Sequence, residues 1–197
     1  MPNRVEAYRI QSAARWTVLA TGYSEPGVAS TIALVQDGPH NIVIDPGMVR
    51  NPASIVRALA RQSLLPRQIT EVVLSHHHPD HTLNAGLFPN ASVHDHWAIY
   101  RADVWTDRKA EGCRISPSVR LLATPGHTDE DITTVVGTRQ GLVAFTHLWW
   151  NEHGPLEDPV AVDARALHRN RRRVLRFATQ IVPGHGAPFG VSTATVR

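Results

Sequence analysis

Short apolar runs separated by turn residues make up most of the chain, and this pattern predicts β-strands. The runs are rich in Val, Ile, Leu and Thr, and Gly, Pro, Asn or Asp bound them. The run that ends at Asp45 is almost entirely apolar, which is typical of a strand buried on both faces. We expect strands over residues 6–11, 15–22, 30–38, 40–47, 69–75, 91–95, 119–127, 132–138, 141–147 and 180–186.

Two longer segments have the apolar spacing of an amphipathic helix. In 51–65 the apolar positions are Ile55, Val56, Leu59 and Ala60. In 162–180 they are Ala166, Leu167, Val174, Leu175 and Ala178. A third, short helix is expected over 82–88.

The strands fall into two blocks, and helices follow each block. This order predicts an α+β fold in which two sheets pack together with helices outside them. The 197 residues are sufficient for one core, and no repeat or linker divides them. We therefore expect a single domain over 1–197.

Composition narrows the class of protein. A net charge of +3 is too small to indicate nucleic-acid binding by itself. No apolar run approaches the roughly 20 residues that span a bilayer, and the first ten residues lack the apolar core of a secretory signal. We expect a cytoplasmic protein without membrane contact. The single cysteine, Cys113, excludes an internal disulfide and is expected to be a small buried or half-buried residue.

Histidine is concentrated in "SHHHPDHT", residues 75–82, directly after a predicted strand. Side chains two apart in an extended segment point the same way, so His76 and His78 can bind one ion while His77 points elsewhere. Pro79 turns the chain, and Asp80 and His81 then face another direction. Two pairs of ligands aimed at neighbouring points are what a dinuclear metal site requires.

Three later histidines also follow predicted strands: His127 in "ATPGHT", His147 in "VAFTHLWW" and His185 in "IVPGHG". Neutral imidazole with carboxylate oxygen is a ligand set that suits Zn²⁺. We expect two zinc ions, with iron or manganese as the alternative at one site.

This pattern, H-x-H-x-D-H followed by later histidines, resembles the metallo-β-lactamase-fold hydrolases. The segments "LFPNASVHD", "TPGHTDEDITTVVGT" and "RFATQIVPGHGAPF" are most similar to the subfamily called metallo-β-lactamase domain-containing protein one. The resemblance implies a four-layer αββα sandwich with its site along one edge of the sheets. It also implies the role of Asp45, in "IDPG", as a residue that supports the metal loop without binding metal. The ligands that it implies are His76, His78 and His127 for one metal and Asp80, His81 and His185 for the other.

His147 departs from the family pattern, which has a bridging aspartate at this strand end. A carboxylate can bridge two cations, whereas a neutral imidazole has one free lone pair and can bind only one. We expect His147 to be a ligand of one metal, with weaker occupancy or altered metal choice there. The alternative is that Glu152 or Asp158, in the next loop, replaces the missing carboxylate.

The expected chemistry is hydrolysis by a zinc-bound hydroxide, because zinc lowers the pKa of its water to roughly 7. Asp80 would orient the nucleophile or accept its proton. The substrate would be a small molecule with an ester, lactone, thioester or amide bond. Two alternatives stay open: a nuclease for single-stranded RNA, and a metal-binding or ligand-sensing protein with little turnover. The oligomeric state is open.

Other conspicuous residues have simpler interpretations. We expect His94, His96, His153 and His168 at the surface or the rim of the site. The arginines at 165, 169, 172, 173 and 176 are expected to form a solvated helix face, with a phosphate-binding patch as the alternative. Trp149 and Trp150 are assigned to the wall of the cleft, with core packing as the alternative, and Trp97 and Trp105 to a cover over the site. Specificity is expected from loops 96–112 and 148–162.

Overall fold

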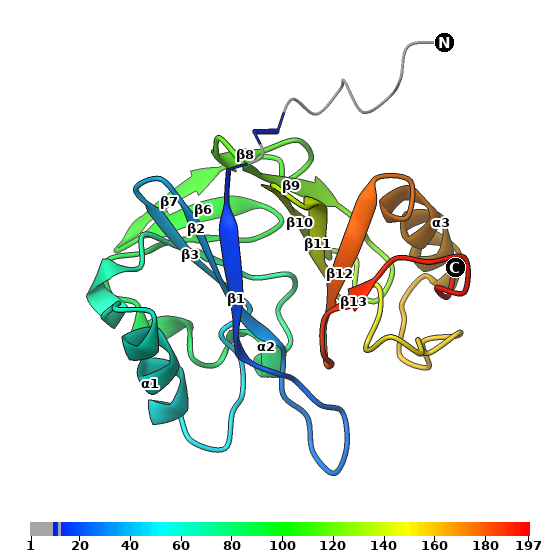
Figure 1. Cartoon of the computed structure of the whole chain (residues 1–197), viewed down its shortest axis with the longest axis horizontal. Coiled ribbons are helices and arrows are strands. Elements are labelled where there is room, and N and C mark those ends of the chain that lie inside the picture. The colour runs from blue at the N-terminus through cyan, green and yellow to red at the C-terminus, as the bar shows by residue number, and fades with distance from the viewer. Residues whose placement is uncertain (1–9, 12) are drawn as a thin grey trace.

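Two β-sheets lie face to face and a helix covers the outer face of each, so the layers follow the order α, β, β, α (Figure 1). The structure is a computed structural model and describes residues 10, 11 and 13–197. The predicted fold class, two mixed sheets flanked by helices, is confirmed. The strand expected over 6–11 lies almost wholly outside the described residues.

Within the described residues the first sheet has seven strands, which lie side by side in chain order. They are β1 (Arg15–Ala20), β2 (Ile32–Asp37), β3 (His40–Ile44), β4 (Glu71–Val73), β5 (Ser92–His94), β6 (Ala98–Arg101) and β7 (Val104–Asp107). β3, β4 and β5 run parallel to one another, so their carboxyl ends meet at one edge. The connection from β3 to β4 contains α1 (Ala53–Arg61).

The second sheet has six strands in the order β13-β12-β11-β10-β9-β8. They are β8 (Arg114–Ser116), β9 (Val119–Ala123), β10 (Ile132–Thr138), β11 (Gly141–Thr146), β12 (Ala178–Pro183) and β13 (Phe189–Gly190). Only β11 and β12 are parallel neighbours, and α3 (Ala164–Val174) connects them. The ends of β11 and β12 therefore also reach a common edge.

Three apolar clusters hold these layers together. The cluster between the sheets contains Val35, Ile44, Leu121, Val136 and Phe145 among its members. The other two lie under the helices: Ile55 and Leu59 of α1 pack on the first sheet, and Leu167 and Val174 of α3 pack on the second. Successive side chains of a strand point to opposite faces of its sheet, so some enter the cluster between the sheets and others point to the outer face. β2 and β10 are therefore buried almost throughout.

The helices are shorter than predicted. α1 keeps Ile55 and Leu59 buried, but Ala60 is exposed. α3 ends at Val174, and Ala178, predicted on its apolar side, belongs to β12. The helix expected over 82–88 is wrong: one turn, α2 (Pro79–Thr82), begins earlier at Pro79, and the 3-10 turn η3 (Ala85–Leu87) follows. A further 3-10 turn, η2 (Pro66–Gln68), precedes β4.

Four strands, β6, β7, β8 and β13, were not predicted. β6 and β7 form a hairpin whose turn residues are Ala102 and Asp103, so the turn lacks the Asn-Gly or Asp-Gly signal of such turns. Ala102 has the positive φ, 53°, that this turn requires. His94, predicted at the surface, is instead buried at the end of β5, where its Nε2 lies 2.8 Å from Glu71 Oε2. His153 is exposed, whereas His96 and His168 are half-buried.

A buried carboxylate joins the two sheets at the end opposite the short helix α2. Asp37, the last residue of β2, accepts hydrogen bonds from Ser116 Oγ at 2.6 Å, Ser118 N at 2.7 Å and Ser118 Oγ at 3.0 Å. Burial alone would raise the pKa of Asp37, but these hydrogen bonds outweigh it and lower the pKa below its usual value. The ionised form is therefore the one that the folded state stabilises.

We expect Asp37→Asn to lower the free energy of unfolding by about 1–3 kcal/mol at neutral pH, because a charged acceptor of several hydrogen bonds is lost. A lowered folded pKa stabilises the protein above the unfolded pKa, and this contribution disappears as pH falls through the folded value. The difference from wild type should therefore shrink below about pH 4. Denaturant unfolding in the presence of chelator, with Asp103→Asn as the exposed control, measures it. A difference that does not change in the acid range would contradict this assignment.

Candidate metal centre

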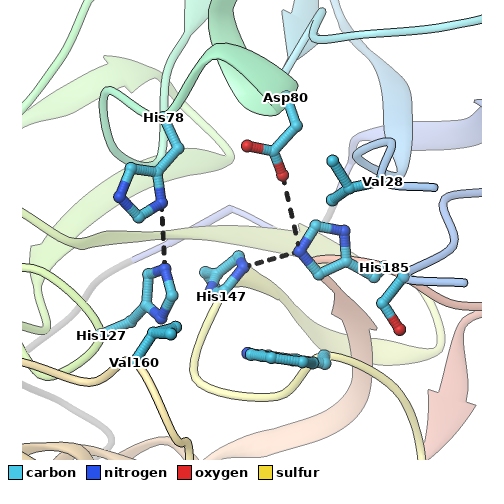
Figure 2. Close-up of a pocket in the computed structure, with 9 residues that line it drawn as sticks. Val28, His78, Asp80, His127, His147, Val160 and His185 are labelled. Atoms are coloured by element: carbon cyan, nitrogen blue, oxygen red, sulfur yellow. Dashed lines mark hydrogen bonds and ion pairs between the residues drawn. The ribbon is translucent and has the colours of Figure 1, made fainter.

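All seven predicted metal ligands lie together at one edge of the two sheets, on loops that follow strands. They are His76, His78, Asp80 and His81 after β4, His127 after β9, His147 after β11 and His185 after β12. Figure 2 shows five of them around one pocket, with their rings and carboxylate turned toward one another. The shared edge of the parallel strands brings these loops together.

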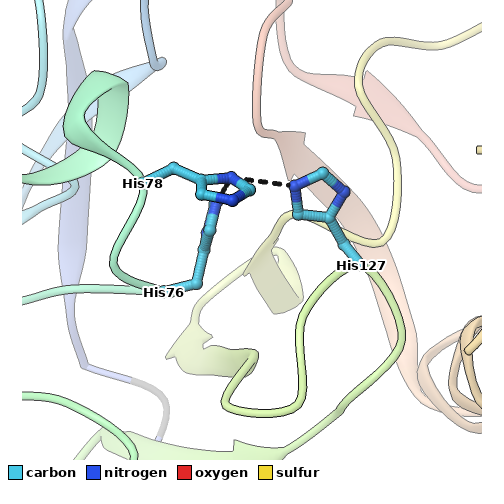
Figure 3. A group of neighbouring side chains, drawn as sticks. All are labelled: His76, His78 and His127. Atoms are coloured by element: carbon cyan, nitrogen blue, oxygen red, sulfur yellow. Dashed lines mark hydrogen bonds between the residues drawn. The ribbon is translucent and has the colours of Figure 1, made fainter. Parts of the chain in front are cut away.

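The first candidate ligand group, called the first ligand group below, consists of His76, His78 and His127, which the structure brings together (Figure 3). His78 Nδ1 lies 3.0 Å from His76 Nε2 and 3.1 Å from His127 Nε2. His78 has extended backbone angles just before α2, so the two-residue alternation with His76 is maintained. Three nitrogens from two distant loops thus face one point.

His77 points away from this group, as predicted. Its Nε2 lies 3.1 Å from Asp95 Oδ2, and its ring stacks on Trp97 with centroids 5.1 Å apart. Trp97 and Trp105 are exposed and do not line the pocket, so the prediction that they cover the site is wrong. Loop 96–112 contributes no lining residue within the described part of the chain.

The second ligand group consists of Asp80, His81 and His185. Asp80 Oδ2 lies 3.4 Å from His81 Nε2 and 3.7 Å from His185 Nε2. Pro79 occupies the first turn of α2, which rotates Asp80 and His81 away from His76 and His78. Asp80 makes no side-chain cap for this turn, so its carboxylate is directed to the site.

His147 lies between the two groups. Its Nε2 is 3.0 Å from His185 Nε2, and its ring centroid is 4.0 Å from that of His127 and 4.6 Å from that of His76. Of the two carboxylates considered as its replacement, Glu152 is exposed, whereas Asp158 is buried next to His127.

Burial and mutual repulsion keep most of these imidazoles neutral. The pKa values of His76 and His147 lie well below the usual value, first because burial penalises the charged ring and then because other histidines surround it. The pKa values of His78 and His185 are lowered for the same leading reason. Neutral rings have the free lone pairs that metal binding requires.

His81 and Asp80, in contrast, are stabilised in their charged forms. Burial favours neutral His81, but the carboxylates of Asp45 and Asp80 outweigh it and raise the pKa of His81 to about 9. Burial would raise the pKa of Asp80, yet the hydrogen bond and charge of His81 outweigh it and lower this pKa. Asp80 is therefore an ionised carboxylate at neutral pH, next to a cationic ring.

The residues fit a divalent metal ion. Two nitrogens bound to one tetrahedral zinc ion, each at about 2.0–2.1 Å, lie about 3.3 Å apart, close to the separations in the first group. Among the described residues, His147 Nδ1 is buried without a hydrogen-bond partner, and His81 Nε2 has only Asp80 Oδ2, 3.4 Å away, beside it. Buried nitrogens without partners are costly unless a ligand satisfies them.

Outer contacts fix which nitrogen of each ring faces inward. Asp45 accepts from Ser75 N at 2.7 Å and lies 2.9 Å from His81 Nδ1, so it contacts both ends of the loop that it is predicted to support. His185 Nδ1 donates to the carbonyl of Ala29 at 3.0 Å. With the proton held on Nδ1, the Nε2 lone pair of His185 is directed into the site, and Nε2 of His81 points there too but has to give up its proton before it can bind metal.

Gly47, the last residue of "IDPG", allows the metal loop to approach the first sheet. A Cβ at this position would overlap the carbonyl oxygen of Asp80. The same carbonyl accepts hydrogen bonds from Ser30 N and Met48 N, both at 3.1 Å. Glycine is therefore needed here for space.

The site opens into a cavity of about 220 Å³. Apolar parts of its lining are Val28, Trp150 and Val160, and Ser24 adds a hydroxyl. Trp150 and Val160 belong to loop 148–162, as predicted, whereas Trp149 is fully buried in the core. Ser24 and Val28 come from the connection between β1 and β2, which the sequence analysis did not assign to the site.

Comparison with known proteins identifies the family. A model of the metallo-beta-lactamase superfamily matches residues 26–186. The chain belongs to the metallo-beta-lactamase superfamily. Most members of this superfamily are hydrolases.

Curated relatives support the subfamily resemblance. Metallo-beta-lactamase domain-containing protein 1 of Xenopus laevis is 29% identical over 188 residues, which cover 88% of this chain and 80% of the relative. The Homo sapiens protein of the same name is 34% identical over 174 residues, covering 84% of this chain and 64% of the relative. This chain thus spans just under two thirds of the human protein.

Solved structures of the superfamily share the fold. A Thermus thermophilus metallo-beta-lactamase family protein has a TM-score of 0.66 at 18% identity, covering 89% of this chain and 74% of that one. An N-acyl homoserine lactone hydrolase with the product N-hexanoyl-L-homoserine at its catalytic metal center has a TM-score of 0.61 at 19% identity, covering 89% and 91%. At these identities the likeness concerns the fold alone.

We expect Gly47→Ala to lower the free energy of unfolding by about 3 kcal/mol, because the backbone of Asp80 cannot move without breaking its hydrogen bonds. Gly86→Ala is the matched control, since nothing lies within 4 Å of a Cβ at Gly86. Chemical denaturation of both variants makes the comparison. Equal stability of the two would show that Gly47 is not needed for space.

We expect His147→Ala to lose about one metal ion per chain relative to wild type, because one lone pair is removed from the cluster. His147→Asp should retain metal, since a carboxylate can also bind there. Elemental analysis of the purified proteins measures this, with exposed His153→Ala as the control. A metal content equal to wild type in His147→Ala would contradict its role as a ligand.

Proposed function

We propose that this protein is a hydrolase that uses two zinc ions to cleave an ester, lactone, thioester or amide bond of a small molecule. The observation that carries the proposal is the convergence of six imidazoles and Asp80 at one pocket, with inward nitrogens 3.0–3.1 Å apart. Membership of a superfamily made up mostly of hydrolases supports it.

His76, His78 and His127 would hold one ion, and Asp80, His81, His147 and His185 the other. Zinc ions bound there would polarise the substrate and lower the pKa of water to roughly 7. Asp80 is ionised, lines the pocket and lies beside His81 and His185. We assign to its carboxylate the orientation of the attacking water and the acceptance of its proton.

The pocket favours a small substrate with an apolar part. Val28 lies near His185 and Val160 near His127, so apolar side chains flank the cluster (Figure 2). Both are exposed at the mouth, where a bound molecule would cover them. None of the described residues that line the pocket is lysine or arginine, the side chains that normally neutralise phosphates. A small carbonyl compound therefore fits better than a polynucleotide.

The test is a substrate panel of nitrophenyl esters, lactones, thioesters and an oligonucleotide, each assayed with and without chelator. Chelation should abolish hydrolysis of one carbonyl class, and zinc should restore it. His78→Ala should reduce kcat/KM by about 100-fold or more, because it removes a nitrogen shared by two short contacts. His153→Ala changes an exposed histidine that is not among the residues lining the pocket, and this variant should match wild type.

The remaining outcomes separate the competing functions. Hydrolysis that survives both chelation and His78→Ala would rule out the metal mechanism. Cleavage restricted to the oligonucleotide, with strongly salt-dependent binding, would favour a nuclease. Zinc uptake without turnover on any substrate would favour a sensing or metal-binding role.

A further inference from the structure

Asp158 is a buried carboxylate that contacts the first ligand group from behind. Its Oδ2 lies 2.8 Å from His127 Nδ1 and accepts from Trp150 Nε1 at 3.1 Å. Its Oδ1 accepts from the backbone N–H of Val160 at 3.0 Å. Both oxygens are therefore engaged, and the side chain is held in one orientation.

A carboxylate in this position selects the tautomer of His127. Because ionised Asp158 can only accept, the proton of the neutral ring belongs on Nδ1, and Nε2 keeps its lone pair. Nε2 is the atom that lies 3.1 Å from His78 Nδ1, inside the ligand group. Asp45 makes the same kind of contact with His81, so each ligand group has one histidine held by a buried aspartate.

The loop that carries Asp158 is itself held by Arg171, the buried arginine of α3. Its guanidinium donates to the carbonyls of Leu148 at 2.7 Å, Pro155 at 2.7 Å and Leu156 at 2.8 Å. It also lies 5.6 Å from the ring centroid of Trp149. Three charge-assisted hydrogen bonds to one loop make it an ordered support.

The far end of the same loop returns to the segment that carries His127. The N–H of Val162 donates to the carbonyl of His127 at 3.1 Å, and that of Asp163 to the carbonyl of Gly126 at 3.0 Å. The backbone beside Asp158 and the backbone of His127 are therefore fixed relative to each other. The side chains of Asp158 and His127 can therefore form their hydrogen bond without any further loss of backbone freedom.

We propose that Asp158 is a positioning residue: it orients His127 for metal and does not bind the ion itself. This inference rests on the proposed function, because it assumes that His127 is a ligand. Asp158 contacts the Nδ1 side of His127, whereas the ligand group faces Nε2. It also fixes Trp150, so the same carboxylate places one wall of the pocket.

The experiment measures zinc affinity by competition with a chromogenic chelator. Asp158→Asn keeps the shape of the side chain but supplies one acceptor oxygen in place of two, and we expect it to weaken zinc binding about 10–100-fold. Glu157→Gln, the exposed acidic neighbour on the same loop, is the matched control and should bind as wild type. Nitrogen-15 spectra of the metal-free histidines supply a second readout: His127 should be protonated on Nδ1 in wild type and lose this preference in Asp158→Asn.

A double-mutant cycle with His127→Ala separates positioning from direct ligation. If Asp158 acts through His127, Asp158→Asn should change zinc affinity less than about threefold in the His127→Ala background. An undiminished loss there would overturn the proposal in favour of a direct ligand. Unchanged affinity of Asp158→Asn in the wild-type background, or an unchanged His127 tautomer, would also overturn it. Failure of wild type to take up zinc would instead overturn the proposed function, and this inference with it.

Discussion

The structure depends on one electrostatic constraint: imidazole rings from four loops have to be buried together with their free nitrogens facing one another. Five of the six rings in the cluster are buried, and burial lowers the pKa of His76 and His147 well below the usual value. Neutral rings avoid mutual charge repulsion, but two lone pairs 3.0 Å apart have no attraction of their own. A shared proton or a metal ion resolves this, and the buried Nδ1 of His147, which has no hydrogen-bond partner among the described residues, favours the metal.

This constraint explains why surrounding groups contact the outward-facing Nδ1 atoms of several rings. Asp45, the carbonyl of Ala29 and Asp158 each contact an Nδ1 atom, and each is held by backbone that belongs to a different connection. A ring without such a contact can flip or change tautomer, and its inward lone pair is then lost. The glycine at position 47 has a related function, because it admits the backbone of Asp80 to the same edge of the sheet.

The sequence predicted the layers, the candidate ligands that the structure brings together and one of their supports, Asp45, but not the role of Asp158, for a physical reason. Strand periodicity and the spacing of His76, His78, Asp80 and His81 are local properties, so they can be read along the chain. Asp158 acts on His127 from 31 residues away, and its role depends on a loop whose path is set by the buried Arg171 of α3. Arg171 was not assigned to the solvated face of this helix, but its role as a buried residue of the core could not be predicted from the sequence. Val28 was missed because nothing in its local sequence distinguishes an exposed valine at a pocket from one elsewhere.

Because His147 is a neutral ring and not a carboxylate, the site has one negative charge fewer to balance bound metal ions. The resemblance to the family implies a bridging carboxylate at this strand end; the neutral ring of His147 leaves Asp80 as the only carboxylate among the described residues that line the cavity. Two bound dications would then leave a strong positive excess, which attracts electron-rich oxygen atoms at the metals. The lining adds no lysine or arginine to this field but supplies valine and tryptophan. Polar recognition would thus be concentrated at the metals and apolar recognition at the walls, a division suited to a substrate with one carbonyl group joined to an apolar part.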